Sequence, residues 1–480
     1  MMRLLRAKSN SLLSNSLFIF LIRFFPSLAN VLVVVLFSRM LDRPSYGAYQ
    51  GFWTHLIVIS AIACMGVQSF MLTYKPDVIR LLLRRISSGF YLGFGMWMVV
   101  CSVILALLHH DTFGIGWLIP FLYLTVYACS TICESLLIAF RRYANLVWVN
   151  FVHTGVFCSL HWLLIEGTIS WIELFIYLLL LAGCRLLIYI ISLFRETKKK
   201  PGLAELNRPI SDFLSLWMHL GVYDVTQVLF RWIDKAIIAF IVGEELFALY
   251  YNGSIDIPFL PLLLGAVAGA GLMRLANTHA ATDEQQTALS LVNRTGRLLS
   301  CIVFPLFFFF VCFRYELFEV VLSEKYIAAV PIFLVSVMVM PLRAYSFTTV
   351  LQNRHKGSVI NIGAIADLLL ACVMMYPLYL WLGLPGVALS FVVSSYLQAA
   401  YYLYHTGAVL DVSIARLIPL KNWLFKLIVF GCLFIGVHYL LAPYYDKFIV
   451  LFWGIVLVIV TALASLWLEY KKASQHGRSA

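Results

Sequence analysis

Long hydrophobic runs separated by short polar connections extend over almost the whole sequence. A helix that crosses a bilayer needs about 20 predominantly apolar residues, and the hydropathy pattern supplies about 14 such runs. The pattern therefore predicts an all-α polytopic membrane protein with about 14 transmembrane helices. The predicted spans are residues 15–38, 48–72, 87–109, 115–140, 145–165, 172–194, 211–241, 246–274, 295–312, 327–351, 357–380, 386–406, 421–441 and 447–469.

The composition excludes most other classes of protein. Of the 480 residues, 62% are hydrophobic and 12% are charged, whereas ordinary globular proteins carry about 25% charged residues. A cytosolic enzyme, a secreted disulfide-rich domain and a disordered protein are all inconsistent with these values. The first run follows Arg3, Arg6 and Lys8 and lacks a small-residue cleavage site, so we expect an uncleaved helix and no signal peptide.

The net charge of +12 is distributed asymmetrically between the two sides of the membrane. With the N-terminus placed in the cytoplasm, 25 of the 35 Lys and Arg residues fall in cytoplasmic connections and tails. The outer connections hold only Arg39, Arg43, Arg314, Lys325 and Lys447. Cytoplasmic connections of membrane proteins are rich in basic residues, so the pattern predicts a multi-pass protein with both termini in the cytoplasm.

A polar connection at about residues 195–208 suggests a division into lobes. We expect an N-terminal six-helix lobe at 1–200, a C-terminal six-helix lobe at 201–410, and a terminal helix pair with a cytoplasmic tail at 411–480. A weak internal repeat supports the division, because at an offset of 201 positions Tyr46 aligns with Phe247 and Tyr49 with Tyr250. Parallel repeats of this kind are a recurrent plan in transporters.

The sequence contains no pattern that indicates chemistry. It has no GxxxxGK[ST] nucleotide-binding loop and no HExxH zinc motif. The ten cysteines form no CxxC pair, and Cys129 and Cys133 are expected to be apolar packing residues. The outer connections are short, and His109-His110-Asp111 is expected to be a solvated turn. We therefore expect a transporter without a cofactor or a metal.

Charged residues inside the predicted spans are the candidate functional groups, because each costs about 2.5–3.5 kcal/mol at mid-membrane unless it faces a cavity or a partner. In the seventh span, Asp224, Gln227, Arg231 and Asp234 share one helical face, as do Ser16, Arg23, Ser27 and Asn30 in the first and Tyr123, Tyr127, Ser130 and Glu134 in the fourth. We infer a hydrated central cavity between the two lobes, with arginine on both walls.

Arginine favours phosphate groups through bidentate charge-assisted hydrogen bonds. The predicted pyrophosphate-binding residues are Arg23, Arg231, Lys235 and Arg343, the predicted polar lining is Asn30, Gln227 and Tyr127, and the candidate ion-coupling acids are Asp224, Asp256, Glu134 and Asp367. The alternatives are that Arg231 pairs with Asp234, that Lys235 reaches the outer headgroups, and that Arg185 pairs within the first lobe.

Three short motifs carry a family resemblance. They are Arg39-Met40-Leu41 followed by Tyr46-Gly47-Ala48-Tyr49, Gly383-Leu384-Pro385-Gly386 before the twelfth span, and Asp234-Lys235 followed by Gly243 and Tyr250. In this order and spacing, the chain resembles the polysaccharide-export (Wzx-type) flippases of the multidrug/oligosaccharidyl-lipid/polysaccharide exporter superfamily. The likeness extends over essentially the whole helix layout.

The resemblance implies alternating access of a cavity between two six-helix lobes. It implies an undecaprenyl-pyrophosphate-linked oligosaccharide as cargo, moved across the bacterial cytoplasmic (inner) membrane for O-antigen, lipopolysaccharide, capsule or exopolysaccharide biosynthesis, with a polysaccharide polymerase and chain-length machinery as partners. Lipid II flippases of the superfamily carry basic residues on the first helix, and Arg23 matches them in kind. A cation-coupled multidrug exporter is the alternative, and a membrane polymerase or acyltransferase is disfavoured by the short outer connections.

Overall fold

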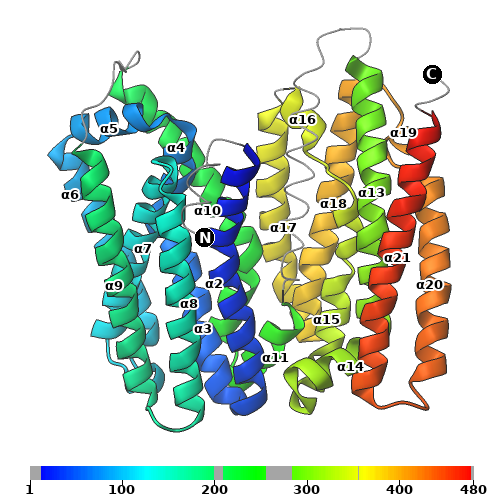
Figure 1. Cartoon of the computed structure of the whole chain (residues 1–480), viewed down its shortest axis with the longest axis horizontal. Helices are drawn as coiled ribbons and strands as arrows, with labels where there is room; N and C mark the ends of the chain where they lie inside the picture. Colours follow the sequence, from blue (N-terminus) through cyan, green and yellow to red (C-terminus); the bar gives the residue numbers. More distant parts are fainter. Residues whose placement is uncertain (1–11, 199–208, 256–283, 355, 477–480) are drawn as a thin grey trace. The chain divides into compact units, whose positions relative to one another are not determined.

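The computed structural model describes residues 12–198, 209–255, 284–354 and 356–476. All regular secondary structure in these residues is helical, with no strand among them, which confirms the predicted all-α polytopic class. The chain divides into two compact units, Met1–Ala248 and Leu249–Ala480. Within each unit the long helices run side by side (Figure 1).

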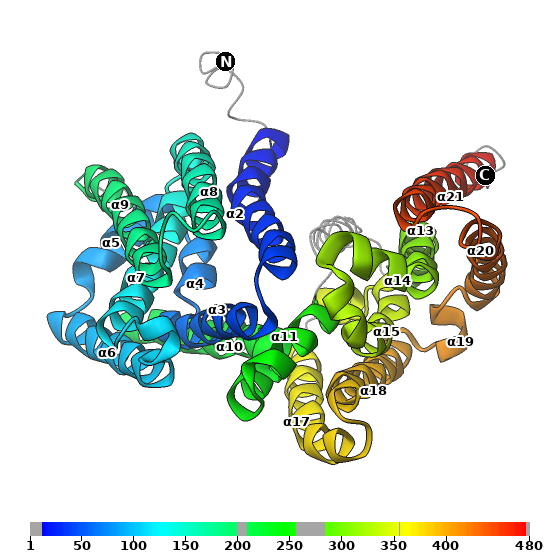
Figure 2. The ribbon, with the colours of Figure 1, turned by 90° about the horizontal axis from the view of Figure 1, so that it is seen from below.

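The first unit contains one 3-10 turn, η1 (Thr112–Gly114), and ten α-helices. The helices are α2 (Leu12–Met40), α3 (Arg43–Cys64), α4 (Val67–Thr73), α5 (Pro76–Arg85), α6 (Ser88–His109), α7 (Leu118–Ala139), α8 (Tyr143–Ile165), α9 (Trp171–Thr197), α10 (Ile210–Ile241) and α11 (Glu244–Gly253), the last of which ends beyond the unit boundary. Viewed along the helices, α7 is central and packs against α3, α4, α6, α8 and α9, while α2 packs mainly on α8 (Figure 2).

Side chains that accept hydrogen bonds from the first turn set several helix starts. Asp42 accepts from the Ser45 amide at the start of α3, and Ser87 accepts from the Phe90 amide at the start of α6. Ser170 and Glu173 form a reciprocal capping box at the start of α9. Each cap satisfies an amide that has no partner within its helix.

The second predicted span is bent by 48° between α3 and α4. Met65 and Gly66 both adopt left-handed backbone angles there, with φ of 44° and 67°. A Cβ atom on Gly66 would lie 2.5 Å from the Cα of Gly221 in α10. Because Gly66 and Gly221 both lack a Cβ atom, α10 can cross the bend at this distance.

A charged cluster joins α5 to the end of α9 and to the α7–α8 turn. Glu196 is 2% exposed, and its carboxylate accepts hydrogen bonds from Arg142 and Arg80. Arg80 also bonds the Glu196 carbonyl oxygen at 3.1 Å and Asp77 at 2.5 Å. Because the buried carboxylate is paired twice, it holds three elements together at one end of the unit.

The second unit contains the remaining described elements. They are α13 (Glu284–Cys312), α14 (Arg314–Leu317), a π-helical turn η2 (Phe318–Leu322), η3 (Glu324–Ala329), α15 (Val330–Val337), η4 (Met340–Ala344), α16 (Thr349–Asn353), α17 (Gly357–Leu382), α18 (Leu384–Leu410), α19 (Ile414–Leu417), α20 (Leu420–Leu441) and α21 (Lys447–His476). The pair α17–α18 packs closely, and the Tyr402 hydroxyl donates to the Ile360 carbonyl oxygen at 2.8 Å.

Lys426 attaches the terminal helices α20 and α21 to α13. Lys426 lies near the start of the predicted span 421–441 and belongs to the basic residues counted as cytoplasmic, but its side chain is buried within α20. Its ammonium group donates to the Arg297 carbonyl oxygen at 2.7 Å and to Ser300 at 3.0 Å, and lies 3.2 Å from Glu469. Burial of Lys426 is tolerated because its N–H donors have oxygen acceptors and its charge is paired with Glu469.

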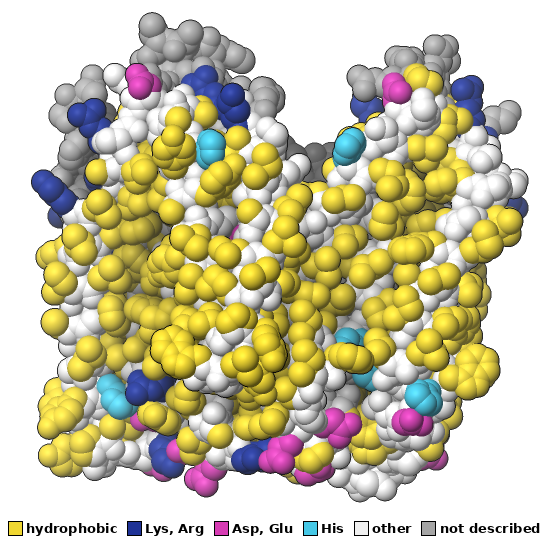
Figure 3. Space-filling view, turned by 180° about the vertical axis from the view of Figure 1, so that it is seen from behind, with side chains coloured by type: hydrophobic (Ala, Val, Ile, Leu, Met, Phe, Trp, Pro, Cys, Tyr) yellow, Lys and Arg dark blue, Asp and Glu magenta, His cyan; other side chains and the backbone are white. Residues whose placement is uncertain are grey.

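Ten described helices are long and apolar enough to cross a membrane, or eleven if the bent pair α3–α4 counts as one span. The predicted count of 14 is not confirmed. The tenth predicted span, 327–351, is broken into α15, η4 and α16, and most of the eighth, 246–274, lies outside the described residues. In each unit, hydrophobic side chains cover the middle of the face that Figure 3 shows, and Lys and Arg gather at its upper edge.

The internal repeat has a structural counterpart in helix boundaries. The end of α2 at Met40 and the end of α10 at Ile241 are 201 positions apart, as are the starts of α3 at Arg43 and α11 at Glu244. Arg43 also pairs with Glu245 at 2.7 Å. The predicted six-helix lobes 1–200 and 201–410 and the terminal helix pair 411–480 stay a prediction.

Candidate functional site

Three polar side chains meet inside the first unit, one from each of α7, α8 and α9. The Tyr189 hydroxyl lies 3.0 Å from a Glu134 carboxylate oxygen and 2.8 Å from the Asn150 side-chain oxygen. The Asn150 amide nitrogen is 3.4 Å from the same Glu134 oxygen. Asn150 is fully buried and Tyr189 is 1% exposed, so this cluster is shielded from solvent and its hydrogen bonds are hard to replace.

Asn150 also reaches the first helix, where it repairs a defect. Pro26 lies inside α2 and has no N–H, so it cannot bond the carbonyl oxygen of Ile22 four residues earlier. The Asn150 amide nitrogen donates to that oxygen at 3.1 Å. The backbone next to Arg23 is therefore held by a side chain of α8 rather than by the helix itself.

Arg23 follows Ile22 directly and its side chain is exposed on α2. Within the described residues the Arg23 guanidinium has no hydrogen bond or ion pair. Asn30, predicted to share its face, is also exposed. Among the described residues, Arg23 is thus an unpaired cation on α2, three residues before Pro26.

Arg185 of α9 adds a second cation close to the Glu134 cluster. Its guanidinium carbon lies 5.9 Å from the centre of the Tyr189 ring, and its Nε atom is buried without a hydrogen-bond partner among the described residues. Tyr127 and His153 are within its electrostatic reach. The predicted lining residue Tyr127 and the predicted acid Glu134 therefore share one polar region with Arg185.

The predicted stripe on α10 divides into two environments. Gln227 and Arg231 are exposed, whereas Asp224 is half-buried beside Ser69 of α4. Lys235 is 6% exposed and pairs with the neighbouring Asp234 at 3.6 Å. Lys235 also lies 5.6 Å from the Trp232 ring, so its charge is engaged within α10 and the structure does not bring it to Arg231's exposed face.

In the second unit, Asp367 of α17 is 2% exposed. Neither of its carboxylate oxygens has a hydrogen-bond partner among the described residues. Ser394 of α18 and the predicted cation Arg343, exposed on η4, are its electrostatic neighbours. The remaining predicted acid, Asp256, lies outside the described residues.

Several polar contacts were missed by the sequence analysis. His110 and Asp111 are exposed, as the predicted solvated turn requires, but His109 is 7% exposed and its Nε2 atom lies 2.9 Å from Nδ1 of His55. His55 Nε2 is 3.0 Å from the Ala236 carbonyl oxygen of α10. Asn150 and Tyr189 were also overlooked, because each is one of several polar residues in its predicted span and the sequence does not show which of them meet.

Comparison with known proteins gives one family match. Residues 174–331, from α9 into α15, match the model of a family described as polysaccharide biosynthesis proteins. Sequence comparison with curated proteins finds no match.

Solved structures give the fold. The lipid II flippase MurJ in an inward closed conformation aligns with a TM-score of 0.64 at 14% identity, covering 95% of this chain and 99% of that one. An outward-facing multidrug resistance transporter of the MATE family aligns with a TM-score of 0.52 at 12% identity, covering 82% of this chain and 94% of that one. A MOP superfamily transporter from Pyrococcus furiosus gives the same four values.

These matches extend over nearly the whole chain in the first case and over most of it in the others. They show that the chain shares the fold of MurJ and of these transporters, and that residues 174–331 match the polysaccharide biosynthesis family.

Proposed function

We propose that this protein is a flippase that moves a lipid-linked oligosaccharide, carried on undecaprenyl pyrophosphate, across the bacterial cytoplasmic membrane by alternating access. The observation that carries the proposal is the exposed guanidinium of Arg23, which has no hydrogen bond or ion pair within the described residues, on the membrane helix α2 that contains Pro26. An unpaired cation at membrane depth is costly unless it faces water or an anion. A pyrophosphate supplies the anion, and Arg can bind it in bidentate fashion.

The proposed path has two lobes, 1–200 and 201–410, whose first helices α2 and α10 present Arg23 and Arg231 to the substrate. Arg343 adds positive charge from the second lobe, and Asn30, Gln227 and Tyr127 offer polar groups to the glycan. Lys235, which pairs with Asp234, contacts the substrate only after it leaves this partner. The glycan serves O-antigen, capsule or exopolysaccharide assembly, and a polymerase with its chain-length machinery takes the product.

The decisive experiment replaces Arg23 in a strain that lacks the native gene. Arg23→Ala should lower surface polysaccharide about tenfold or more, because a hydrogen bond to a charged group contributes about 1.5–3 kcal/mol. Arg23→Lys should restore part of the activity through charge without the planar fork. Arg416→Ala, which removes an exposed arginine between α18 and α20, is the matched control.

A wild-type amount of surface polysaccharide in cells that express the double variant Arg23→Ala/Arg231→Ala well would refute the proposed site. A cation-coupled small-molecule exporter is the second candidate, because the buried carboxylate of Asp367 suits a cation. Drug resistance conferred by expression, with no polysaccharide phenotype, would favour that candidate.

A further inference from the structure

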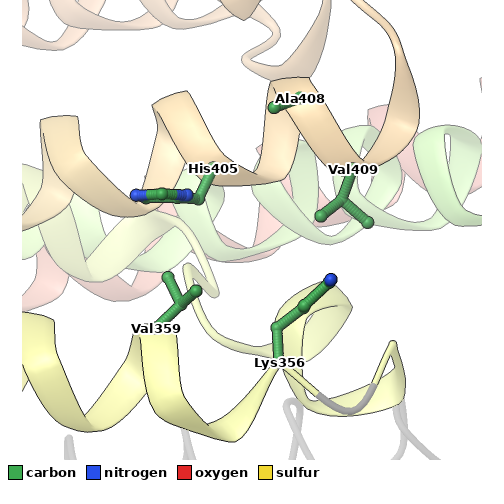
Figure 4. A pocket seen from close by; sticks show the side chains of 5 residues that line it. All are labelled: Lys356, Val359, His405, Ala408 and Val409. Carbon is green, nitrogen blue, oxygen red and sulfur yellow. The ribbon is translucent and has the colours of Figure 1, made fainter.

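A pocket between α17 and α18 in the second unit combines two basic side chains with an apolar floor. Its volume is about 440 Å³, and it is lined by Lys356, Val359, His405, Ala408 and Val409. Figure 4 shows the Lys356 ammonium and the His405 ring in the space between the two helices, with Val359 and Val409 beside them. None of these residues was assigned a role in transport.

The two basic groups are available to a ligand. Within the described residues, neither the Lys356 nor the His405 side chain makes a hydrogen bond or an ion pair. The described contacts of His405 are aromatic, with ring-centre distances of 4.5 Å to Tyr401 and 5.4 Å to Tyr404. No acidic residue is among the described residues that line the pocket, so these residues attract anions and repel cations.

The depth of the pocket matches the headgroup layer of a bilayer. Lys356 directly precedes the candidate span Gly357–Leu382, and His405 and Val409 lie in the last two turns of the candidate span Leu384–Leu410. Both spans therefore reach the same membrane surface at this pocket. Tyr404 is 64% exposed there, and tyrosine is enriched at this interface.

We infer that the pocket binds the phosphate headgroup of an anionic phospholipid of the surrounding bilayer. Lys356 and His405 contact the phosphate oxygens, and no side chain caps the first amides of α17, which adds backbone donors to the same anion. Val359 and Val409 line the side along which the first acyl carbons lie. The volume falls within the range of about 300–1,000 Å³ of small-ligand sites, and accommodates a headgroup without an attached oligosaccharide.

The test is lipid binding to the purified full-length protein, measured by native mass spectrometry during titration with phosphatidylglycerol. The double variant Lys356→Gln/His405→Ala should bind phosphatidylglycerol about tenfold more weakly at this site. Each charged contact at a wet interface contributes about threefold to the affinity, and the variant removes two of them. Lys421→Gln, at the exposed start of α20, should bind as the wild type does. Lys356→Arg should retain binding because it keeps the charge.

Ala408→Glu provides an independent variant, because Ala408 is exposed and its replacement adds a negative charge to the lining without disturbing the core. It should also weaken binding, with an unchanged elution volume in size-exclusion chromatography as the folding control. Wild-type affinity in both variants would overturn the inference. Competition by inorganic phosphate at equal concentration would reassign the pocket to a soluble anion, and displacement by lower concentrations of undecaprenyl pyrophosphate would reassign it to the substrate; either result would also overturn it.

Discussion

Pro26 and Asn150 form a matched pair in the first unit. Proline leaves the Ile22 carbonyl oxygen without its helical donor, and an unsatisfied carbonyl inside a membrane protein costs several kcal/mol. The Asn150 amide supplies the missing donor at 3.1 Å and is itself fixed by Tyr189. The Ile22 carbonyl oxygen next to Arg23 thus stays paired inside the continuous helix α2, although Pro26 lacks an N–H.

This pairing predicts a measurable coupling. Asn150→Leu should lower the free energy of unfolding by about 1–3 kcal/mol, because it leaves the Ile22 carbonyl unpaired. In a Pro26→Ala background the new amide bonds that carbonyl, so the same Asn150 change should cost less. Thermal melts of the four proteins in one detergent measure the difference.

Asn30→Leu, on the exposed face of α2, is the control and should change the melting temperature little. Equal costs of Asn150→Leu in both backgrounds would show that the asparagine is held for another reason, such as its contact with Tyr189.

At the scale of helices, Glu196 decides how α5 is attached. Glu196→Gln removes the charge that pairs with Arg80 and Arg142 and leaves two arginines to repel each other at one end of the unit. We expect faster hydrogen exchange of the amides in α5 and in the start of α8, measured by mass spectrometry. Glu166→Gln, at the exposed end of α8, should leave exchange unchanged.

Gly47, within the Tyr46-Gly47-Ala48-Tyr49 motif, sets the distance between α3 and α11. A Cβ atom at this position would lie 1.9 Å from the Glu244 carbonyl oxygen, which is backbone and cannot rotate away. Gly47→Ala should therefore lower the melting temperature by forcing the two helix starts apart. Gly89→Ala, where a Cβ meets no atom within 4 Å, should be neutral or stabilising.

Apolar periodicity predicted most of the helices because each membrane span is specified locally by about 20 residues. The same signal missed the bend between α3 and α4, because hydropathy does not report backbone angles. Met65 and Gly66 are left-handed at the bend, and Gly221 of α10 packs closely against them. It also did not predict that the Lys426 side chain is buried, because its burial depends on carbonyl and hydroxyl groups 126 or more positions away. Helical spacing identified Glu134 and Tyr127, but it contains no information on Asn150 and Tyr189, which complete the cluster from other helices.

For the molecule as a whole, the basic residues predict the orientation of every connection. A green fluorescent protein fused after Ala480 should fluoresce, because it folds in the cytoplasm. Alkaline phosphatase fused at Asp446, between α20 and α21, should be active because that turn is expected outside. The reverse pattern would contradict an even number of crossings with both termini inside.

Coupling of transport to an ion gradient is a property of the whole molecule. A charged carboxylate at mid-membrane costs about 2.5–3.5 kcal/mol, and Asp367 is 2% exposed, with Ser394 and Arg343 as its polar neighbours. We propose that Asp367 binds a proton or a sodium ion whose gradient biases the two access states. Asp367→Asn imitates the permanently neutral form, so transport in proteoliposomes should become insensitive to an imposed gradient while substrate binding is retained. Asp411→Asn, at the exposed end of α18, should respond to the gradient as the wild type does, and an equal gradient response in Asp367→Asn would place coupling at another acid, Glu134 or Asp224 being the next to test.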